Sequence, residues 1–397
     1  MINIIEKANC CGCTACKETC PTKAIEMMSD EEGFYYPHIT LDKCINCEKC
    51  KKVCPIINKN KENDNLRKVY ISQNMNDEIR LDSTSGGVFS ALAQYVIDKK
   101  GYIFGAEFDE NWRVIHGVGK CSDDLHRFRG SKYVQSYLGN TFYDVKRLLE
   151  NEQWVLFTGT PCQIEGLVSY LHKQYDKLIL MDLVCFSVSS PLVWKIYLNH
   201  LDKTNKIDLS EVTNIKFRDK TKYGYEYSLM NFYGKNGKII YSSGSESNQM
   251  LRSFVSNTSV RPSCYDCKFK KINRVSDFTV WDCYNIYKYN KKLDDNRGTS
   301  HVMVHTVKAQ KIIEEINDKY LRLEQVDINE AIDSEPAMIK SAIINENRKA
   351  FFKSIEEGND CFDFFFKETI RVKSEKLLRK ILSDFKLYSV VKRLVKG

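Results

Sequence analysis

The sequence Cys10-Cys-Gly-Cys-Thr-Ala-Cys-Lys-Glu-Thr-Cys-Pro21 decides the fold of the first part of the chain. It recurs as Cys44-Ile-Asn-Cys-Glu-Lys-Cys-Lys-Lys-Val-Cys-Pro55. Both stretches read C-x2-C-x2-C-x3-C-P, and nine of the sixteen cysteines of the chain lie between Cys10 and Cys54. Two matching runs of thiols this dense indicate metal ligation.

This spacing is that of bacterial two-cluster ferredoxins. Three thiolates on one tight loop can hold three corners of an iron–sulfur cube, while the fourth, on the helical turn that follows, faces the other cube. The alternatives are a structural zinc site or the disulfides of a secreted domain, but zinc prefers two separated pairs of ligands. The spacing therefore predicts two [4Fe–4S] clusters. Their expected ligands are Cys10, Cys13, Cys16 and Cys54 for the first, and Cys44, Cys47, Cys50 and Cys20 for the second.

Composition bounds the class of protein. A length of 397 residues suggests two or three domains, and 43% hydrophobic with 28% charged residues is typical of a soluble globular protein. The sequence shows neither a secretory signal peptide nor an apolar run of about 18 residues. We therefore expect a reducing, cytoplasmic location, in which cysteines bind metal instead of forming disulfides.

The net charge of +8 is concentrated at one end of the chain. Residues 367–397 contain ten Lys or Arg and three acidic residues, so the rest of the chain carries a net charge of about +1. A near-neutral body gives no support for a nucleic-acid partner.

The basic tail is also amphipathic. From Leu377 onward, a set of apolar residues falls on one helical face. A helix of this kind either packs on the body of the protein or lies on an anionic membrane surface, and packing is the commoner outcome. The residues of this face are Leu378, Ile381, Leu382, Phe385, Tyr388, Val391 and Val395.

The order of patterns predicts an α+β (mixed α/β) protein: a ferredoxin-like two-cluster module, then an α/β domain, then a helical C-terminal region. The expected boundaries are 1–57 for the module, 58–68 for a polar linker, 69–150 and 151–320 for two parts of the α/β domain, and 321–397 for the helical region.

Within these parts, hydrophobic periodicity predicts individual elements. Helices are expected over Gly86–Lys100 and Thr141–Leu149 and after Pro161, with a hairpin between Tyr225 and Tyr241 that turns at Asn236-Gly237. Beyond Lys308 the pattern becomes mainly helical. Strands are expected over Val69–Ser72, Tyr102–Phe108, Trp112–Val118, Trp154–Phe157 and Leu178–Val184.

Four further cysteines follow this alternation. Cys162 comes directly after an expected strand, Cys185 ends the next strand, and Cys264 and Cys267 form a C-x2-C pair. Strand ends of one sheet lie close together, so these thiols could hold a third cluster. A zinc site for the C-x2-C pair and plain burial for the strand cysteines remain open as alternatives.

Two loops have the character of anion sites. Ser85, Gly86 and Gly87 precede an expected helix and would present bare amides to a phosphate, although an ordinary capped helix start has the same pattern. The segment Arg127–Tyr133 combines cations with an aromatic ring, which suits an anionic cofactor or an ordinary solvated loop.

In this order, the segments resemble the beta subunit family of coenzyme F420-reducing hydrogenases and dehydrogenases. The resemblance spans about residues 67–307, preceded by a ferredoxin module as in family members with fused ferredoxin domains. The matching pieces are Ser85–Gly87, Gly130–Ser136, Gly159–Gln163 with Gly166, Asp182–Cys185, Arg261–Phe269, Asp277–Asp282 and Gly298–Ser300.

The resemblance implies that this domain binds FAD and a [4Fe–4S] cluster. It implies that Cys162, Cys185, Cys264 and Cys267 are the ligands of that third cluster. It also implies a flavin-side pocket, for which the candidate residues are Ser85, Gly86, Gly87, Lys132 and Tyr133.

The chain departs from the family's pattern in two places. After Cys185 it reads Phe186-Ser-Val-Ser-Ser-Pro191, where many relatives have His-Gly-Val-Pro-Ser-Pro. Trp281 and Asn285 stand where relatives often have glycine, and bulky side chains could block a flat ring there. Coenzyme F420 is therefore one candidate substrate among the hydride carriers.

These patterns predict an iron–sulfur flavoprotein oxidoreductase that passes electrons between a hydride-carrying small molecule, FAD and [4Fe–4S] clusters, and on to a redox protein partner such as ferredoxin or another subunit. The alternative is a non-catalytic electron-transfer subunit or adaptor with an altered flavin site. No catalytic acid or base is assigned, because His116, His301 and His305 fall in expected strands or strand ends, where structural histidines are common. Cys11 is interpreted as a spacer within the first cluster loop.

Overall fold

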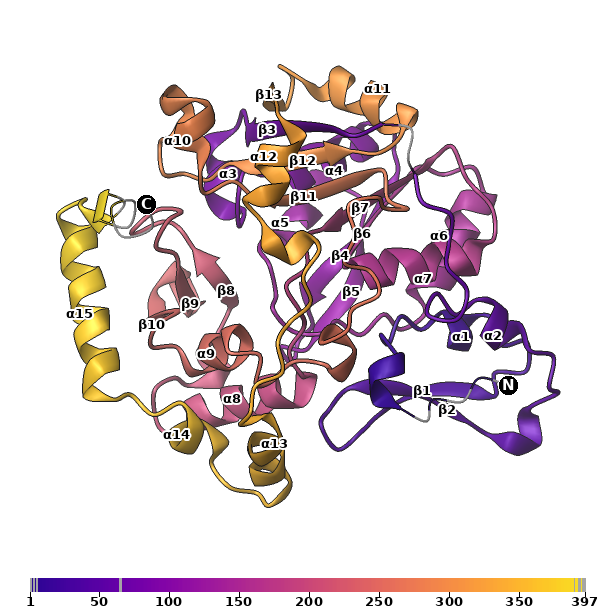
Figure 1. Cartoon of the computed structure of the whole chain (residues 1–397), viewed down its shortest axis with the longest axis horizontal. Helices are drawn as coiled ribbons and strands as arrows, with labels where there is room; N and C mark the ends of the chain where they lie inside the picture. The colour runs from indigo at the N-terminus through magenta and orange to yellow at the C-terminus, as the bar shows by residue number, and fades with distance from the viewer. Residues whose placement is uncertain are drawn as a thin grey trace.

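The computed structural model describes residues 2, 4, 6–63, 66–388, 390–391 and 394 of the chain. The expected face of the C-terminal helix includes Val395, which lies outside these residues. The fold is mixed α/β, with a small N-terminal module, a central mixed sheet covered by helices, a second lobe and a helical C-terminus (Figure 1).

The N-terminal module consists of two matching halves. Each half has a cysteine loop followed by one helical turn, and a two-stranded antiparallel hairpin lies between the loops. The turns are α1 (Ala15–Glu18) and α2 (Lys49–Lys52), and the hairpin strands are β1 (Ile25–Ser29) and β2 (Tyr35–Ile39).

The central sheet has eight strands in the order β13-β3-β12-β11-β7-β6-β4-β5. The four inner strands β11, β7, β6 and β4 are parallel to one another, and the outer strands pair antiparallel. The strands are β3 (Lys68–Asn74), β4 (Tyr102–Phe108), β5 (Val114–Gly119), β6 (Val155–Gly159), β7 (Leu178–Leu183), β11 (Phe278–Asp282), β12 (Ser300–Val304) and β13 (Leu321–Val326).

Helices cover both faces of this sheet, because alternate side chains of each strand point to opposite faces. In β6, Leu156 packs with α4, α5 and α11, while Phe157 packs with α6 and α7. The module adds Cys13, Ala15 and Val53 to the second of these cores, so it rests on the α6/α7 layer. The helices are α3 (Asp77–Asp82), α4 (Val88–Asp98), α5 (Leu125–Phe128), α6 (Thr141–Glu150), α7 (Pro161–Leu171), α10 (Ile286–Tyr289), α11 (Val307–Ile316) and α12 (Ile328–Asp333).

The second lobe is built on a three-stranded antiparallel sheet in the order β10-β9-β8. Its apolar core is rich in aromatic residues and includes Trp194, Phe232 and Phe351. The elements are β8 (Asn214–Asp219), β9 (Leu229–Tyr233), β10 (Ile239–Gly244), α8 (Pro191–Lys203), α9 (Gln249–Val255), α13 (Arg348–Glu356) and α14 (Cys361–Phe365).

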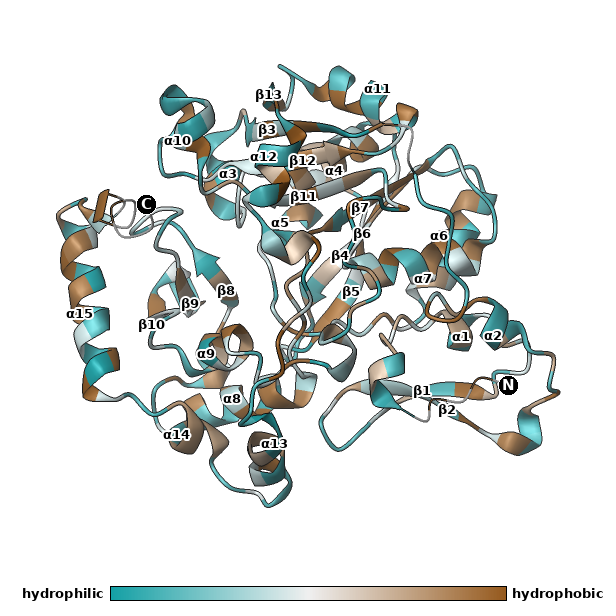
Figure 2. Ribbon diagram, in the orientation of Figure 1, coloured by the Kyte–Doolittle hydropathy of each residue, from teal (hydrophilic) through white to brown (hydrophobic). Residues whose placement is uncertain are grey.

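Helix α15 (Ile370–Asp384) lies at the edge of the molecule beside the second lobe (Figure 1). Hydrophobic and hydrophilic residues alternate along it (Figure 2). Among the described residues, no helix is both long and apolar enough to cross a membrane.

Most expected elements are present within a few residues of their predicted bounds. The strand Tyr102–Phe108 is observed with the expected bounds, and the hairpin turns through Lys235–Gly237, where Asn236 and Gly237 both have positive φ. The mainly helical pattern expected beyond Lys308 is interrupted by β13, because Leu321–Val326 pairs with the free edge of β3.

Candidate redox site

The two cysteine loops of the module share one backbone conformation. Gly12 and Asn46 both have positive φ, of 71° and 51°. Thr14 and Glu48 are also left-handed, with φ of 65° and 58°, and each is the residue before its helical turn. Left-handed residues within a loop turn successive amides toward one side, which is how protein loops surround an anionic cluster.

The cysteines of the second run meet the last cysteine of the first. A cavity of about 20 Å³ is lined by Cys20, Cys44, Cys47 and Cys50. Amides point at these sulfurs: Ala24 N lies 3.3 Å from Cys20 Sγ, and Ile2 N lies 3.2 Å from Cys50 Sγ. This grouping is the ligand set expected for the second cluster.

The other set gathers around Cys16, whose thiol is buried beside Cys10 and Cys54. Burial raises the pKa of the Cys16 thiol, and the neighbouring sulfurs raise it further. Cys13 is also a neighbour of Cys16 and Cys10, and its side chain packs against Gly166 of α7. A β-carbon on Gly166 would lie 2.6 Å from the Cys13 β-carbon, so only glycine admits this close approach.

The four body cysteines also converge. Cys162 is at the start of α7, Cys185 follows β7, and Cys264 and Cys267 come from the loop after α9. All four line a second cavity, of about 40 Å³, together with the cations Arg261, Lys268, Lys270 and Arg274. A cationic lining complements the negative charge of a thiolate-bound cluster.

The acidity of these thiols fits a bound metal. Burial raises the pKa of Cys264 to about 12, and it raises the pKa of Cys185 further, with a contribution from neighbouring Cys264. Thiols this crowded stay protonated unless a metal ion replaces their protons. The four sulfurs therefore fit the ligand set of a cluster.

Cys11 links the module to this site. Its thiol is within hydrogen-bonding distance of both Cys13 and Cys162, and it lines the four-cysteine cavity. The hydrogen bond with Cys13 is the largest cause that raises the pKa of Cys11. The interpretation of Cys11 as a spacer describes its place in the sequence, but the fold places it between two groups of metal-binding candidates.

A buried arginine fixes the module against the body. Arg261 donates hydrogen bonds to the carbonyl oxygens of Cys10 (2.9 Å) and Tyr35 (3.0 Å) and to Gln135 Oε1 (2.9 Å). Its guanidinium lies 4.3 Å from the ring centroid of Tyr36. A fully buried cation with three good acceptors holds its partners in one geometry.

A third and much larger cavity, of about 860 Å³, lies at the carboxyl ends of the inner strands. This is where ligands bind in open α/β sheets. Cys11, Cys162 and Cys185 line both this cavity and the four-cysteine cavity, and so do Phe186, Ser187 and Val188, so the two cavities share a wall that includes three cysteines. The large cavity could hold a cofactor of dinucleotide size.

The loop before α4 forms part of the cavity wall. Ser85 and Gly87 line the cavity, and Gly87 has a φ of 84°. Gly86 points away from it and is packed between β3 and β12, where a β-carbon would lie 2.3 Å from the Ser72 carbonyl oxygen. Lys220 holds the loop by donating to the carbonyl oxygen of Ser85 (2.8 Å).

The segment after α5 supplies Lys132 and Tyr133. Lys132 donates to the carbonyl oxygens of Arg127 (2.9 Å) and Arg129 (3.2 Å), and burial lowers the pKa of this lysine to about 7. Tyr133 stacks on Phe254 with 4.8 Å between ring centroids. Lys132 therefore supports the loop, whereas Tyr133 gives the cavity a flat aromatic wall.

An ion pair also lines the cavity. Arg218 Nη1 lies 2.6 Å from Asp282 Oδ2, and the Arg218 guanidinium lies 5.5 and 5.6 Å from the ring centroids of Tyr225 and Tyr284, which stack on each other. Burial would raise the pKa of Asp282, but Arg218 more than offsets this and holds that pKa below its ordinary value. Tyr225 also lies 3.2 Å from Ser85 Oγ, which joins this group to the loop before α4.

Two models of known protein families match parts of the chain. A family model described as a 4Fe-4S dicluster domain matches residues 9–56, which are the module. A model described as the C terminus of the coenzyme F420 hydrogenase/dehydrogenase beta subunit matches residues 152–329. Residues 152–329 are therefore similar to this beta subunit family. This match confirms the resemblance read from the motifs.

No curated protein matches the chain. Among solved structures, the chain is similar to one from the xenon-derivatised F420-reducing [NiFe] hydrogenase complex of Methanosarcina barkeri. The two are 16% identical, the match covers 75% of this chain and 97% of the other, and the TM-score is 0.47.

Trp281 and Asn285, the two bulky residues within 152–329 that depart from the family's pattern, do not fill the large cavity. Trp281 borders the cavity, but its indole stacks on His301 and packs with Val69 and Met303 on the α12 side of the sheet. Asn285 stands before α10 and does not line the cavity. The cavity therefore stays open despite both substitutions.

Sequence patterns within residues 152–329 did not identify Arg218, Tyr225 or Lys220 as residues of the site. They come from β8 and the loop after it. Arg218 and Tyr225 line the cavity, and Lys220 holds the loop before α4, because the second lobe folds against the sheet. The only available signal was Asp282, which lies within a matching motif and is the partner of Arg218.

Proposed function

We propose that the chain is an iron–sulfur flavoprotein oxidoreductase that moves electrons between a hydride-carrying small molecule and a redox protein partner. FAD would occupy the large cavity, and Cys162, Cys185, Cys264 and Cys267 would hold a third [4Fe–4S] cluster. The observation that carries this proposal is the shared wall of Cys11, Cys162 and Cys185 between the two cavities.

A bound flavin accepts electrons in pairs and releases them singly, and iron–sulfur clusters accept them singly. The residues of the chain would bind and orient the flavin. The amides before α4 and the carboxyl edge of the sheet suit the pyrophosphate, and the aromatic side chains around Tyr133 suit a flat ring.

The partner would dock at the loop of the second cluster. Cys47 is exposed there, and Leu41 and Ile45 are large apolar residues with exposed side chains. Lys43, Lys49, Asp42 and Glu48 are exposed in the same loop. An apolar centre with charged residues of both signs around it suits a redox protein partner, such as a ferredoxin or another subunit.

The hydride carrier would enter the same large cavity as FAD, and coenzyme F420 is one candidate. The alternative, an electron-transfer subunit with an altered flavin site, was suggested by Trp281 and Asn285. Because the cavity stays open around both residues, the geometry favours the flavoprotein.

The experiment is an anaerobic titration of the reconstituted chain with reduced F420, with NADH and with reduced ferredoxin. We expect the flavin absorbance to bleach with at least one donor and to return on oxidation. A chain that binds flavin but is reduced by none of the three donors would contradict the proposed hydride step.

A matched pair of variants tests the location of the flavin. Gly87→Val introduces a side chain at a positive φ, with its β-carbon 2.9 Å from the Asn74 β-carbon at the cavity wall. Gly237→Val has a similar φ of 70° in an open hairpin turn. We expect the first variant to lose flavin and the second to retain it; retention by both would contradict FAD binding beside α4.

A further inference from the structure

The C-terminal helix α15 touches the rest of the chain with one narrow face. Arg379 lies 3.7 Å from the buried carboxylate of Glu246 and 5.9 Å from the ring centroid of Tyr227. Tyr388 packs on the same Tyr227, with 5.1 Å between ring centroids. No residue of α15 itself is buried.

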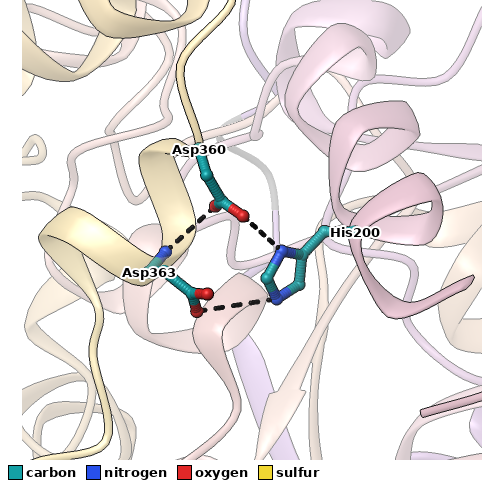
Figure 3. Close-up of side chains that lie close together, drawn as sticks. All are labelled: His200, Asp360 and Asp363. Carbon is teal, nitrogen blue, oxygen red and sulfur yellow. Dashed lines mark hydrogen bonds and ion pairs between the residues drawn. The ribbon is translucent and has the colours of Figure 1, made fainter. Parts of the chain in front are cut away.

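The segment before α15 is anchored firmly. In Figure 3, His200 of α8 lies between two aspartates at the start of α14. His200 Nδ1 is 2.9 Å from Asp360 Oδ2, and its Nε2 is 3.7 Å from Asp363 Oδ1. Because this point is fixed, the direction in which α15 leaves the body is defined, and so is the face that it turns outward.

The outward face of α15 is apolar. Its residues include Ile370, which is 85% exposed, and Phe385, which is 72% exposed. With about 100° of rotation per residue, the exposed apolar residues fall within an arc of about 100°, and Arg379 lies on the far side of the helix. The members of this outward apolar face are Ile370, Leu377, Leu378, Ile381 and Phe385.

Basic residues border this face on both edges. Lys373 and Lys380 lie along one edge, together with the acid Asp384, and Arg371 lies along the other edge; all four residues are exposed. The stems of long basic side chains can lie along an apolar surface while their charges reach outward to anions. The segment 367–397 carries a net charge of +7.

We propose that the outward apolar face of α15 docks the protein on the surface of an anionic lipid bilayer, with the helix lying in the plane of the interface. Such a helix inserts its apolar face at the boundary of headgroups and acyl chains, while its lysines attract anionic headgroups. Of the face expected from the sequence, Leu378, Ile381 and Phe385 are exposed, whereas Tyr388 packs on Tyr227 of the body.

A second copy of the chain fits this face less well. In an antiparallel pair of α15 helices, the edge that carries Lys373, Lys380 and Asp384 would meet the same edge of the other copy, and the net positive charge of that edge opposes association. The rest of the chain has a net charge of about +1, so it offers no strongly acidic counterpart.

The test is co-sedimentation of the full-length chain with vesicles of phosphatidylcholine alone or of phosphatidylcholine mixed with phosphatidylglycerol. We expect the chain to pellet with the anionic vesicles, and we expect high salt to lower the bound fraction. The triple variant L377S/L378S/I381S should lower the bound fraction by about tenfold or more. The matched control I343S/I344S removes two other exposed isoleucines and should pellet like the wild type.

The far-UV circular dichroism spectrum of each variant reports that the fold is intact. Pelleting of the triple variant at the wild-type level would overturn the proposal, and so would equal binding of the wild type to neutral vesicles. A dimer that the triple variant abolishes, together with no vesicle binding by the wild type, would assign the face to self-association and would also overturn it. None of these outcomes depends on flavin or cluster chemistry.

Discussion

Individual cysteine thiols are central to the redox chemistry proposed for this chain, and their positions in the fold distinguish candidate metal ligands from other cysteines. Cys264 lies in the cavity with the other three body cysteines, whereas Cys121 is exposed and lines none of the three cavities described above. The two residues therefore offer a matched comparison of one chemical change at two sites.

We expect Cys264→Ser to lower the iron content from about twelve atoms per chain to about eight, because a cube with three thiolates left is labile. Cys121→Ser should leave about twelve. Iron analysis of anaerobically purified protein measures both. Equal iron in the two variants would exclude Cys264 from the ligand set.

At the same scale, the sequence predicted the eight thiols of the module because their spacing is local and repeated. For the four body cysteines, the strand ends left zinc and plain burial open as alternatives, and the resemblance was needed to favour a cluster, since their convergence depends on neighbouring strands β6 and β7 and on a distant loop. The position of Cys11 beside Cys162 could not be predicted at all, because it arises from docking of the module on α7.

Helix α7 is the element on which that docking depends. Glycine in a helix interior normally costs about 1 kcal/mol relative to alanine, so Gly→Ala usually stabilises. At Gly166 the added β-carbon would lie 2.6 Å from the β-carbon and 2.9 Å from the Sγ of Cys13. Overpacking of this kind costs about 1–3 kcal/mol.

We therefore predict that Gly166→Ala destabilises the protein by about 1 kcal/mol net, which is the opposite of the usual sign. Urea unfolding of the holoprotein measures the change. A stabilised Gly166→Ala variant would mean that the module does not press on α7 as described.

The strands of the central sheet carry buried histidines that make stability depend on pH. Burial lowers the pKa of His305, which follows β12, to about 3. Its unfolded-state pKa is about 6.5, so between these values the unfolded chain binds the extra proton. The contribution of neutral His305 to the free energy of unfolding is therefore fully present above about pH 6.5 and is lost as the pH falls below that value.

His305→Gln should remove this part of the pH dependence, which amounts to about 2 kcal/mol at about pH 5. The free energy of unfolding is compared between neutral and mildly acidic pH, with the exposed His126→Gln as the matched control. Acid lability of the clusters is common to both variants and cancels in the comparison. Identical pH profiles would remove His305 as a cause.

For the whole molecule, the central question is whether the module and the body act as one unit. Besides Arg261, the bidentate pair of Arg348 and Glu32 joins the hairpin turn of the module to α13, with 2.7 Å between Nη1 and Oε1. Both side chains are mostly buried, at 14% and 15% exposure. The overall class and most strands followed from sequence patterns, but this arrangement of parts depends on long-range contacts that no local pattern records.

A double-mutant cycle on Glu32→Gln and Arg348→Gln should give a coupling energy of about 1 kcal/mol or more. Proteolysis within residues 1–57 should be faster in either variant, because the module would be held less firmly. Additive effects would show that this pair does not join the two parts.

The most direct measurement is the flavin and iron content of the full-length chain after anaerobic reconstitution and gel filtration. Two cavities that share a wall of cysteines, together with the two module sites, predict one FAD and about twelve iron atoms per chain. About eight iron atoms and no flavin would confine the redox chemistry to the N-terminal module and contradict the proposed function of the body.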